Sequence, residues 1–228
     1  MSEKKHYRFL DLSGYMFSGK AAVIDLIREF KGYYVPYYRF EFPLIRIQDG
    51  IMDLEKALVD DWSPIRSDIA IKRFIKLVTK MSGHKKKLFS LKEEELVRGW
   101  NFNRLFEDKF YKLSIDYAYS LIDLKTKAYW PYSSLNETFH EILKNRIIQL
   151  FKILHNLFKR KRWKDIDVLA TESEIFLASG DRFYELTKEY LEKLLSIPIK
   201  DDSIHTIVMH NAFEPFNPWR PLRYFEDA

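Results

Sequence analysis

The chain has 228 residues and a net charge of +5; 46% of the residues are hydrophobic and 31% are charged. This size and composition predict one folded domain with a substantial core and argue against long disordered segments. Cysteine is absent, which excludes disulfides and thiol chemistry and favours a cytoplasmic location. No secretory leader and no apolar run of about 18 residues is visible, so a membrane span is not expected. The modest positive charge permits an anionic ligand without predicting nucleic-acid binding.

The first elements along the chain alternate between strand and helix. Residues 6–13 are predicted to form a strand, residues 20–30 a helix, and residues 33–36 a second, short strand. The segment 32–42 is rich in aromatic residues. It is interpreted either as ordinary strand and core packing or as an aromatic-lined acceptor site close to the loop before the helix.

Helical patterns dominate the middle of the chain. An amphipathic helix is predicted near residues 52–60. A longer one begins with Ser63 as N-cap and Pro64 in the first turn, and runs to Met81. Beyond residue 84 the helical periodicity continues, and a last apolar run resembles a buried strand. The predicted segments are helices over 91–98, 103–126, 134–162 and 182–196, then the strand 204–209.

The most informative motif joins the first strand to the first helix. It runs Gly14, Tyr15, Met16, Phe17, Ser18, Gly19 and Lys20, and satisfies the phosphate-binding pattern G-x-x-x-x-G-K. Main-chain N–H groups of such a loop, together with the positive end of the following helix, bind anions. A lysine at a helix N-terminus opposes the macrodipole, and a bound anion would compensate it. The motif therefore predicts a phosphate site.

The usual metal ligands of such a site are missing. Ala21 stands where a Ser or Thr hydroxyl normally binds Mg²⁺. The strand 204–209 ends in His210 and Asn211, where nucleotide hydrolases carry an Asp. We therefore expect phosphate binding without a metal ion.

With these residues in view, the loop resembles the 5′-phosphosulfate-binding loop of sulfotransferases, whose pattern is approximately (S/T)-x-x-(R/K)-S-G-(T/K)-(T/S). Residues 211–228 also resemble the approach to that family's 3′-phosphate motif, which is itself absent. Phe17 replaces the usual basic residue, and Ala21 and Ala22 replace hydroxyl residues. The resemblance covers about a fifth of the chain.

The resemblance implies a fold, a reaction and a co-substrate. The expected fold is α/β: one P-loop NTPase-like domain over 1–228, with a three-layer parallel sheet and a mainly helical insert over 84–200. Such folds place the first strand centrally, so the strand 204–209 is expected beside it and parallel to it, with His210 and Asn211 next to the loop. The implied reaction moves a sulfuryl group from 3′-phosphoadenosine-5′-phosphosulfate to a hydroxyl or amine acceptor, with a saccharide as the example. Residues 14–21 would hold the nucleotide, and Lys20 would stabilise the leaving phosphate.

Candidate catalytic and acceptor-binding residues lie in two further places. Asp60 or Asp61 could act as the general base, with Trp62 and Arg66 contacting the acceptor. The other interpretation is structural: acidic residues before a helix, a Ser cap and an Arg paired with an acidic neighbour. His210 is either a base at the carboxyl end of its strand or a structural strand-end residue.

Two other functions remain open on the sequence. One is a kinase-like phosphotransferase that uses ATP with an unusual Mg²⁺ site, and the other is a degenerate nucleotide-binding module without catalysis. The three predicted strands make a thin sheet, which suggests either that the family's C-terminal part is lacking or that further strands are not recognised in the sequence. An exposed apolar sheet edge would favour self-association, for instance as a homodimer.

Overall fold

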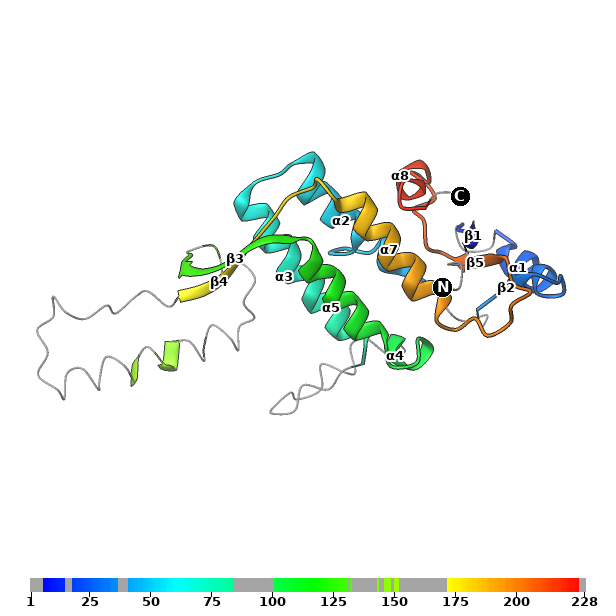
Figure 1. The fold of residues 1–228 in the computed structure, drawn as a ribbon, viewed down its shortest axis with the longest axis horizontal. Coiled ribbons are helices and arrows are strands. Elements are labelled where there is room, and N and C mark those ends of the chain that lie inside the picture. Colours follow the sequence, from blue (N-terminus) through cyan, green and yellow to red (C-terminus); the bar gives the residue numbers. More distant parts are fainter. Residues whose placement is uncertain are drawn as a thin grey trace, which may run out of the picture.

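The computed structural model describes residues 6–14, 18–36, 41–83, 101–130, 132, 143, 146–148, 150, 151 and 172–225. The fold is mixed α/β, with a small parallel sheet at one end and a layer of helices beside it (Figure 1). The predicted helix 91–98 and most of the predicted helix 134–162 lie outside the described residues.

The parallel sheet contains β1 (Arg8–Leu12), β5 (Thr206–His210) and β2 (Tyr33–Tyr34), in that order. Leu12 pairs with His210, so β1 and β5 end at the same edge. The prediction that the late strand lies parallel to the first is confirmed. The expectation that β1 is central is wrong, because β5 occupies the middle. Ile207 and Val208, whose side chains point to opposite faces of the sheet, are each 1% exposed, as expected for a central strand that is covered on both faces.

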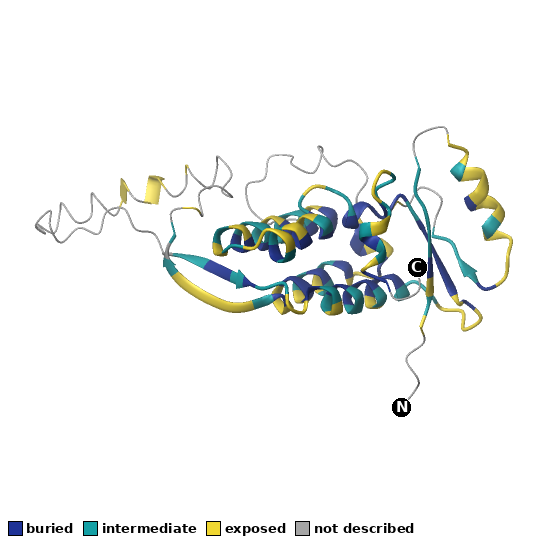
Figure 2. Cartoon of the chain, turned by 90° about the horizontal axis from the view of Figure 1, so that it is seen from above, coloured by how far each residue is buried: buried dark blue, intermediate teal, exposed yellow. Residues whose placement is uncertain are grey.

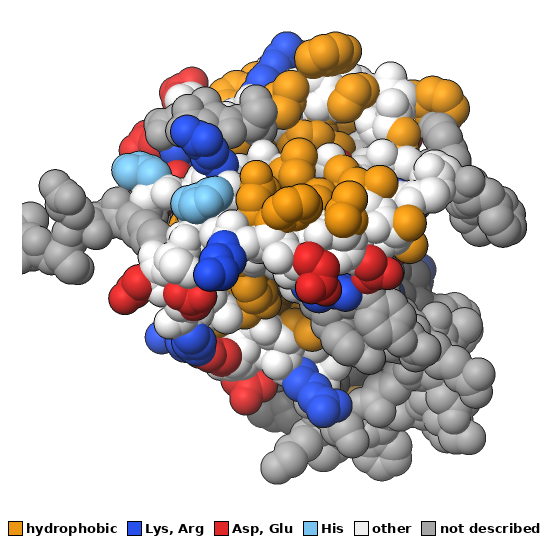
Figure 3. All heavy atoms as spheres, turned by 90° about the vertical axis from the view of Figure 1, so that its right-hand side faces the viewer, with side chains coloured by type: hydrophobic (Ala, Val, Ile, Leu, Met, Phe, Trp, Pro, Cys, Tyr) orange, Lys and Arg blue, Asp and Glu red, His pale blue; other side chains and the backbone are white. Residues whose placement is uncertain are grey.

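Helix α1 (Lys20–Arg28) covers the face of the sheet that is turned away from the other helices (Figure 2). Ile24 is its buried residue, whereas Val23, Leu26 and Phe30 are 45–61% exposed. Apolar side chains gather on this end of the molecule (Figure 3). Self-association through apolar surface remains a prediction.

The helical layer follows the predicted elements closely. Helix α2 (Ile51–Glu55) continues as a π-helical turn, η2 (Lys56–Asp60), and α3 spans Pro64–Met81. Ser63 caps α3 as predicted, since its Oγ accepts a hydrogen bond from the N–H of Arg66 at 3.2 Å. Helix α7 (Phe183–Ser196) matches the predicted 182–196 helix. The remaining short helices are η1 (Pro43–Ile45), α4 (Phe102–Leu105) and α8 (Trp219–Leu222).

The predicted continuous helix over 103–126 is wrong. Helix α5 (Phe110–Ser120) is followed by strand β3 (Ile122–Tyr129), which pairs antiparallel with β4 (Glu172–Ala178). The segment 122–128 alternates uncharged and charged residues, a period of two that favours a strand. The region 84–200 therefore contains a two-stranded sheet as well as helices.

Strand β4 is anchored on α3 by a buried carboxylate. Asp68 is fully buried; its Oδ1 accepts a hydrogen bond from the N–H of Phe176 at 3.0 Å, and its carboxylate pairs with Lys72 at 2.8 Å. The hydrophobic core runs without interruption from the parallel sheet, through Phe42, to the helical layer around Phe74. Within the part of the chain that is described, no helix has both the length and the apolar character needed to cross a membrane.

Candidate functional site

The described part of the loop between β1 and α1 ends in a left-handed glycine. Gly19 precedes α1 with φ = 75°, and no atom lies within 4 Å of the position that a Cβ would take. The glycine is therefore required by its left-handed backbone and not by crowding. The N–H of Ala22 donates to the carbonyl of Gly19 at 3.1 Å and begins the helix. Tyr15, Met16 and Phe17 of the predicted loop lie outside the described residues.

Lys20 connects the two ends of this loop with the end of β5. Its Nζ donates to the carbonyl oxygen of Gly14 at 2.7 Å and to Oδ1 of Asn211 at 2.5 Å. Both acceptors are neutral, and no described carboxylate forms an ion pair with Lys20. The ammonium charge therefore adds to the positive end of the α1 dipole at this edge of the sheet.

Asn211 is the centre of the polar cluster at the carboxyl ends of β1 and β5. It is 5% exposed and has φ = 54°, a left-handed conformation that asparagine tolerates better than most residues. Its Nδ2 donates to Oε1 of Glu41 at 2.6 Å, and its carbonyl accepts from Nε of Arg46 at 2.9 Å. Three hydrogen bonds to charged side chains thus fix this residue in a strained conformation, an arrangement that recurs at functional sites.

The chain after β5 is held against the end of β1. Oδ1 of Asp11 accepts a hydrogen bond from the N–H of Ala212 at 3.1 Å, and Oγ of Ser13 accepts from the N–H of Phe213 at 3.0 Å. Burial raises the pKa of Asp11 above its usual value, although these hydrogen bonds oppose the shift. The two ends are therefore locked together, and the loop and the residues after β5 form one site.

His210 lies at the same edge. Among the described residues neither of its ring nitrogens has a hydrogen-bond partner, and both nitrogens are shielded from solvent. Burial, followed by the charge of Lys20, lowers the pKa of His210 below its usual 6.5. The imidazole is therefore neutral at pH 7, the state in which it can accept a proton.

The other predicted site residues lie at the corner between η2 and α3. The contacts that they form with described residues do not reach loop 14–20. Asp60 forms an ion pair with Arg220 of α8. Asp61 lies 3.4 Å from Arg66, and Trp62 donates from Nε1 to a carbonyl of β4 at 2.7 Å. These contacts match the structural interpretation of this segment.

The sequence interpretation missed three members of the cluster, Asp11, Glu41 and Arg46, and it placed Asn211 at this edge without predicting its hydrogen bond with Lys20. Asn211 had a visible signal, since it follows a buried strand and the carboxyl ends of parallel strands share an edge. Glu41 and Arg46 lie in irregular segments on either side of η1, where no periodic pattern indicates their direction. Among the described residues, no group of three or more His, Asp or Glu side chains is arranged to hold a metal ion.

Comparison with known proteins found no matching family model, curated protein or solved structure.

Proposed function

We propose that the chain binds the phosphates of a nucleotide at loop 14–21 and transfers a sulfuryl group from 3′-phosphoadenosine-5′-phosphosulfate to a hydroxyl or amine acceptor. One observation carries the proposal. Lys20 begins α1 beside the carboxyl ends of two parallel strands, and among the described residues only neutral oxygens accept hydrogen bonds from it. A P-loop NTPase-like fold is part of the same proposal.

Electrostatics favour an anion at this position. The N-terminus of α1 and the Lys20 ammonium add positive charge at one point, and neither is compensated by a described carboxylate. A phosphate oxygen could replace the carbonyl of Gly14 or the amide oxygen of Asn211 as the acceptor for Nζ. A charged hydrogen bond of this kind contributes about 1.5–3 kcal/mol.

The choice of sulfuryl transfer over ATP-dependent phosphoryl transfer is supported by the side chains available. Ala21 offers no hydroxyl to Mg²⁺, and β5 ends in His210 and Asn211 in place of the usual aspartate. Asn211 itself is already committed to Lys20 and Glu41. Direct positioning of the donor by main-chain amides and Lys20 fits this set of side chains.

In the proposed transfer, one bond to sulfur forms and another breaks. The acceptor oxygen or nitrogen forms a bond to sulfur while the bond from sulfur to the 5′-phosphate oxygen breaks. Neutral His210 takes the acceptor proton, and Lys20 stabilises the negative charge that develops on the departing phosphate. Asp60 and Asp61 have no part in this scheme, because their contacts lie at the η2–α3 corner.

Isothermal titration with adenosine 3′,5′-bisphosphate tests the binding step. Lys20→Ala should weaken binding by roughly 10- to 150-fold, the equivalent of one charged hydrogen bond. Lys31→Ala is the matched control, since Lys31 is exposed just beyond α1 and carries the same charge. Equal affinity in the wild type and Lys20→Ala would remove the loop from the site.

Thermal shifts with and without Mg²⁺ test the chemistry. Stabilisation by the bisphosphate should be the same in EDTA and in Mg²⁺, and sulfuryl transfer should be lost in Lys20→Ala. Strong stabilisation by ATP in Mg²⁺ alone would instead identify a kinase-like phosphotransferase.

A further inference from the structure

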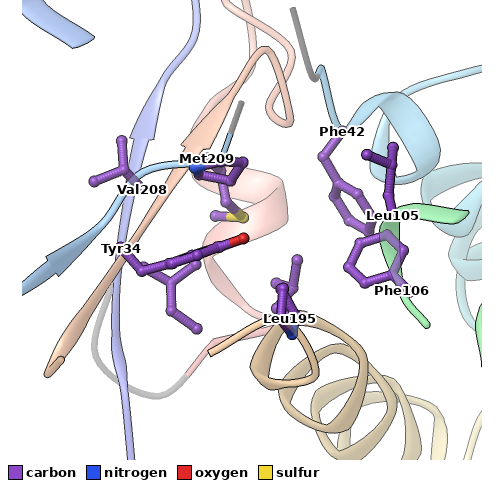
Figure 4. Close-up of a pocket in the computed structure, with 10 residues that line it drawn as sticks. Tyr34, Phe42, Leu105, Phe106, Leu195, Val208 and Met209 are labelled. Carbon is purple, nitrogen blue, oxygen red and sulfur yellow. The ribbon is translucent and has the colours of Figure 1, made fainter. Parts of the chain in front are cut away.

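A partly open cavity of about 110 Å³ lies between β5 and the ends of α4 and α7 (Figure 4). Phe42 and Phe106 form one wall, Leu195 forms another, and Ile207 and Met209 of β5 form the base. The rings of Phe42 and Phe106 are 6.3 Å apart and meet edge to face, which makes the wall firm. The lining is thus almost wholly apolar.

The cavity has one polar group and an accessible rim. Tyr34 extends from β2, with its hydroxyl directed toward the space between β5 and the helices (Figure 4). No described residue forms a hydrogen bond with this hydroxyl. Burial raises the pKa of Tyr34, so its hydroxyl stays protonated and can donate a hydrogen bond. Leu105, at the rim, is 41% exposed. A small apolar group can therefore enter, and one polar atom of it can be recognised.

Two lining residues of the cavity adjoin the polar cluster around Lys20 in the sequence. Phe42 directly follows Glu41, whose carboxylate accepts a hydrogen bond from Asn211. The N–H of Phe42 donates to the carbonyl of His210 at 3.0 Å, and Met209 directly precedes that histidine. The cavity therefore lies next to the cluster along these two segments, although the described residues that line it include no member of the cluster.

We propose that this cavity holds an apolar ring or branched alkyl group of the acceptor molecule, with the reacting hydroxyl or amine at the polar cluster. This inference rests on the proposed function and names the class of its acceptor. An apolar cavity of roughly 150 Å³ can hold benzene. This cavity, of about 110 Å³, is smaller but partly open, so it suits a branched alkyl group, or a ring that extends through the opening. A bare saccharide fits poorly, because its hydroxyls would lose water without gaining partners.

Saturation-transfer NMR on the full chain, without nucleotide, tests the cavity. The probe is benzyl alcohol, and methyl glucoside is the polar comparison. Leu105→Trp should fill the rim and weaken benzyl alcohol binding about tenfold or more. Leu124→Trp is the matched control, because Leu124 is an exposed leucine (53%) on β3. Tyr34→Phe should weaken benzyl alcohol binding and leave toluene binding unchanged.

Three results would overturn the inference: equal binding of benzyl alcohol by Leu105→Trp and the wild type, an equal loss in Leu124→Trp, or binding of methyl glucoside as tight as that of benzyl alcohol. Failure of the nucleotide site gives a different pattern. In that case Lys20→Ala leaves bisphosphate binding unchanged, while benzyl alcohol still binds and Leu105→Trp still weakens it, which supports the cavity as an independent apolar site.

Discussion

The strained Asn211 gives the sharpest test of the cluster's architecture. Replacing it with glycine removes the hydrogen bonds to Lys20 and Glu41 but keeps a backbone that adopts φ = 54° freely. Hydrogen bonds to charged groups contribute about 1.5–3 kcal/mol each, and solvent screening of half-buried Lys20 and exposed Glu41 reduces this to about 1 kcal/mol each. Asn211→Gly should therefore lower the free energy of unfolding by about 2 kcal/mol.

Asn211→Ala removes the same hydrogen bonds and adds a Cβ in the left-handed region, which costs about 1 kcal/mol more. Urea denaturation followed by circular dichroism measures both variants, with Asn217→Ala as a control at an exposed asparagine. The order of stability should be wild type, then Asn211→Gly, then Asn211→Ala. Equal stability of the two variants would refute the strain, and values within about 0.5 kcal/mol of the wild type would refute the hydrogen-bond network.

Three further predictions address other parts of the molecule. Glu55 is fully buried and bound by Arg220, so Glu55→Ala should cost about 3–5 kcal/mol in urea denaturation. Glu55→Gln keeps the size of the side chain but loses its charge, so it should also destabilise the protein; a Gln variant as stable as the wild type would contradict a charge-based role. Ser63→Ala should cost about 1 kcal/mol in urea denaturation through loss of the α3 cap, whereas Ser203→Ala, at an exposed serine, should cost nothing measurable. The lowered pKa of His210 means that the unfolded chain binds a proton first, so stability should fall as the pH drops below 6.5 and level off below the folded-state pKa. His210→Gln should flatten that part of the pH profile of the unfolding free energy, and an unchanged slope would show that His210 does not contribute.

Local patterns predicted most elements of the described fold. The Ser63 and Pro64 pair marked the start of α3, and an apolar run of 3.6-residue period marked α7. The predicted helix over 103–126 is wrong at β3 because of the local sequence. Residues 122–128 carry a period of two, but they follow directly on the helical pattern of α5, and only the distant partner strand β4 stabilises them as a strand. A strand whose partner lies some fifty residues away along the chain is weakly specified by its own sequence.

The candidate site was likewise predicted only in part from the sequence. The sequence by itself determined the loop, because Gly19 must adopt a positive φ and Lys20 must begin the helix. It also predicted that Asn211 reaches this edge, since parallel strands end together. Only the tertiary structure decided that Glu41 and Arg46 join Asn211 while Asp60 pairs with Arg220. A local sequence pattern does not specify which distant donor or acceptor a polar side chain meets; the packing of distant elements decides which group comes within hydrogen-bonding distance.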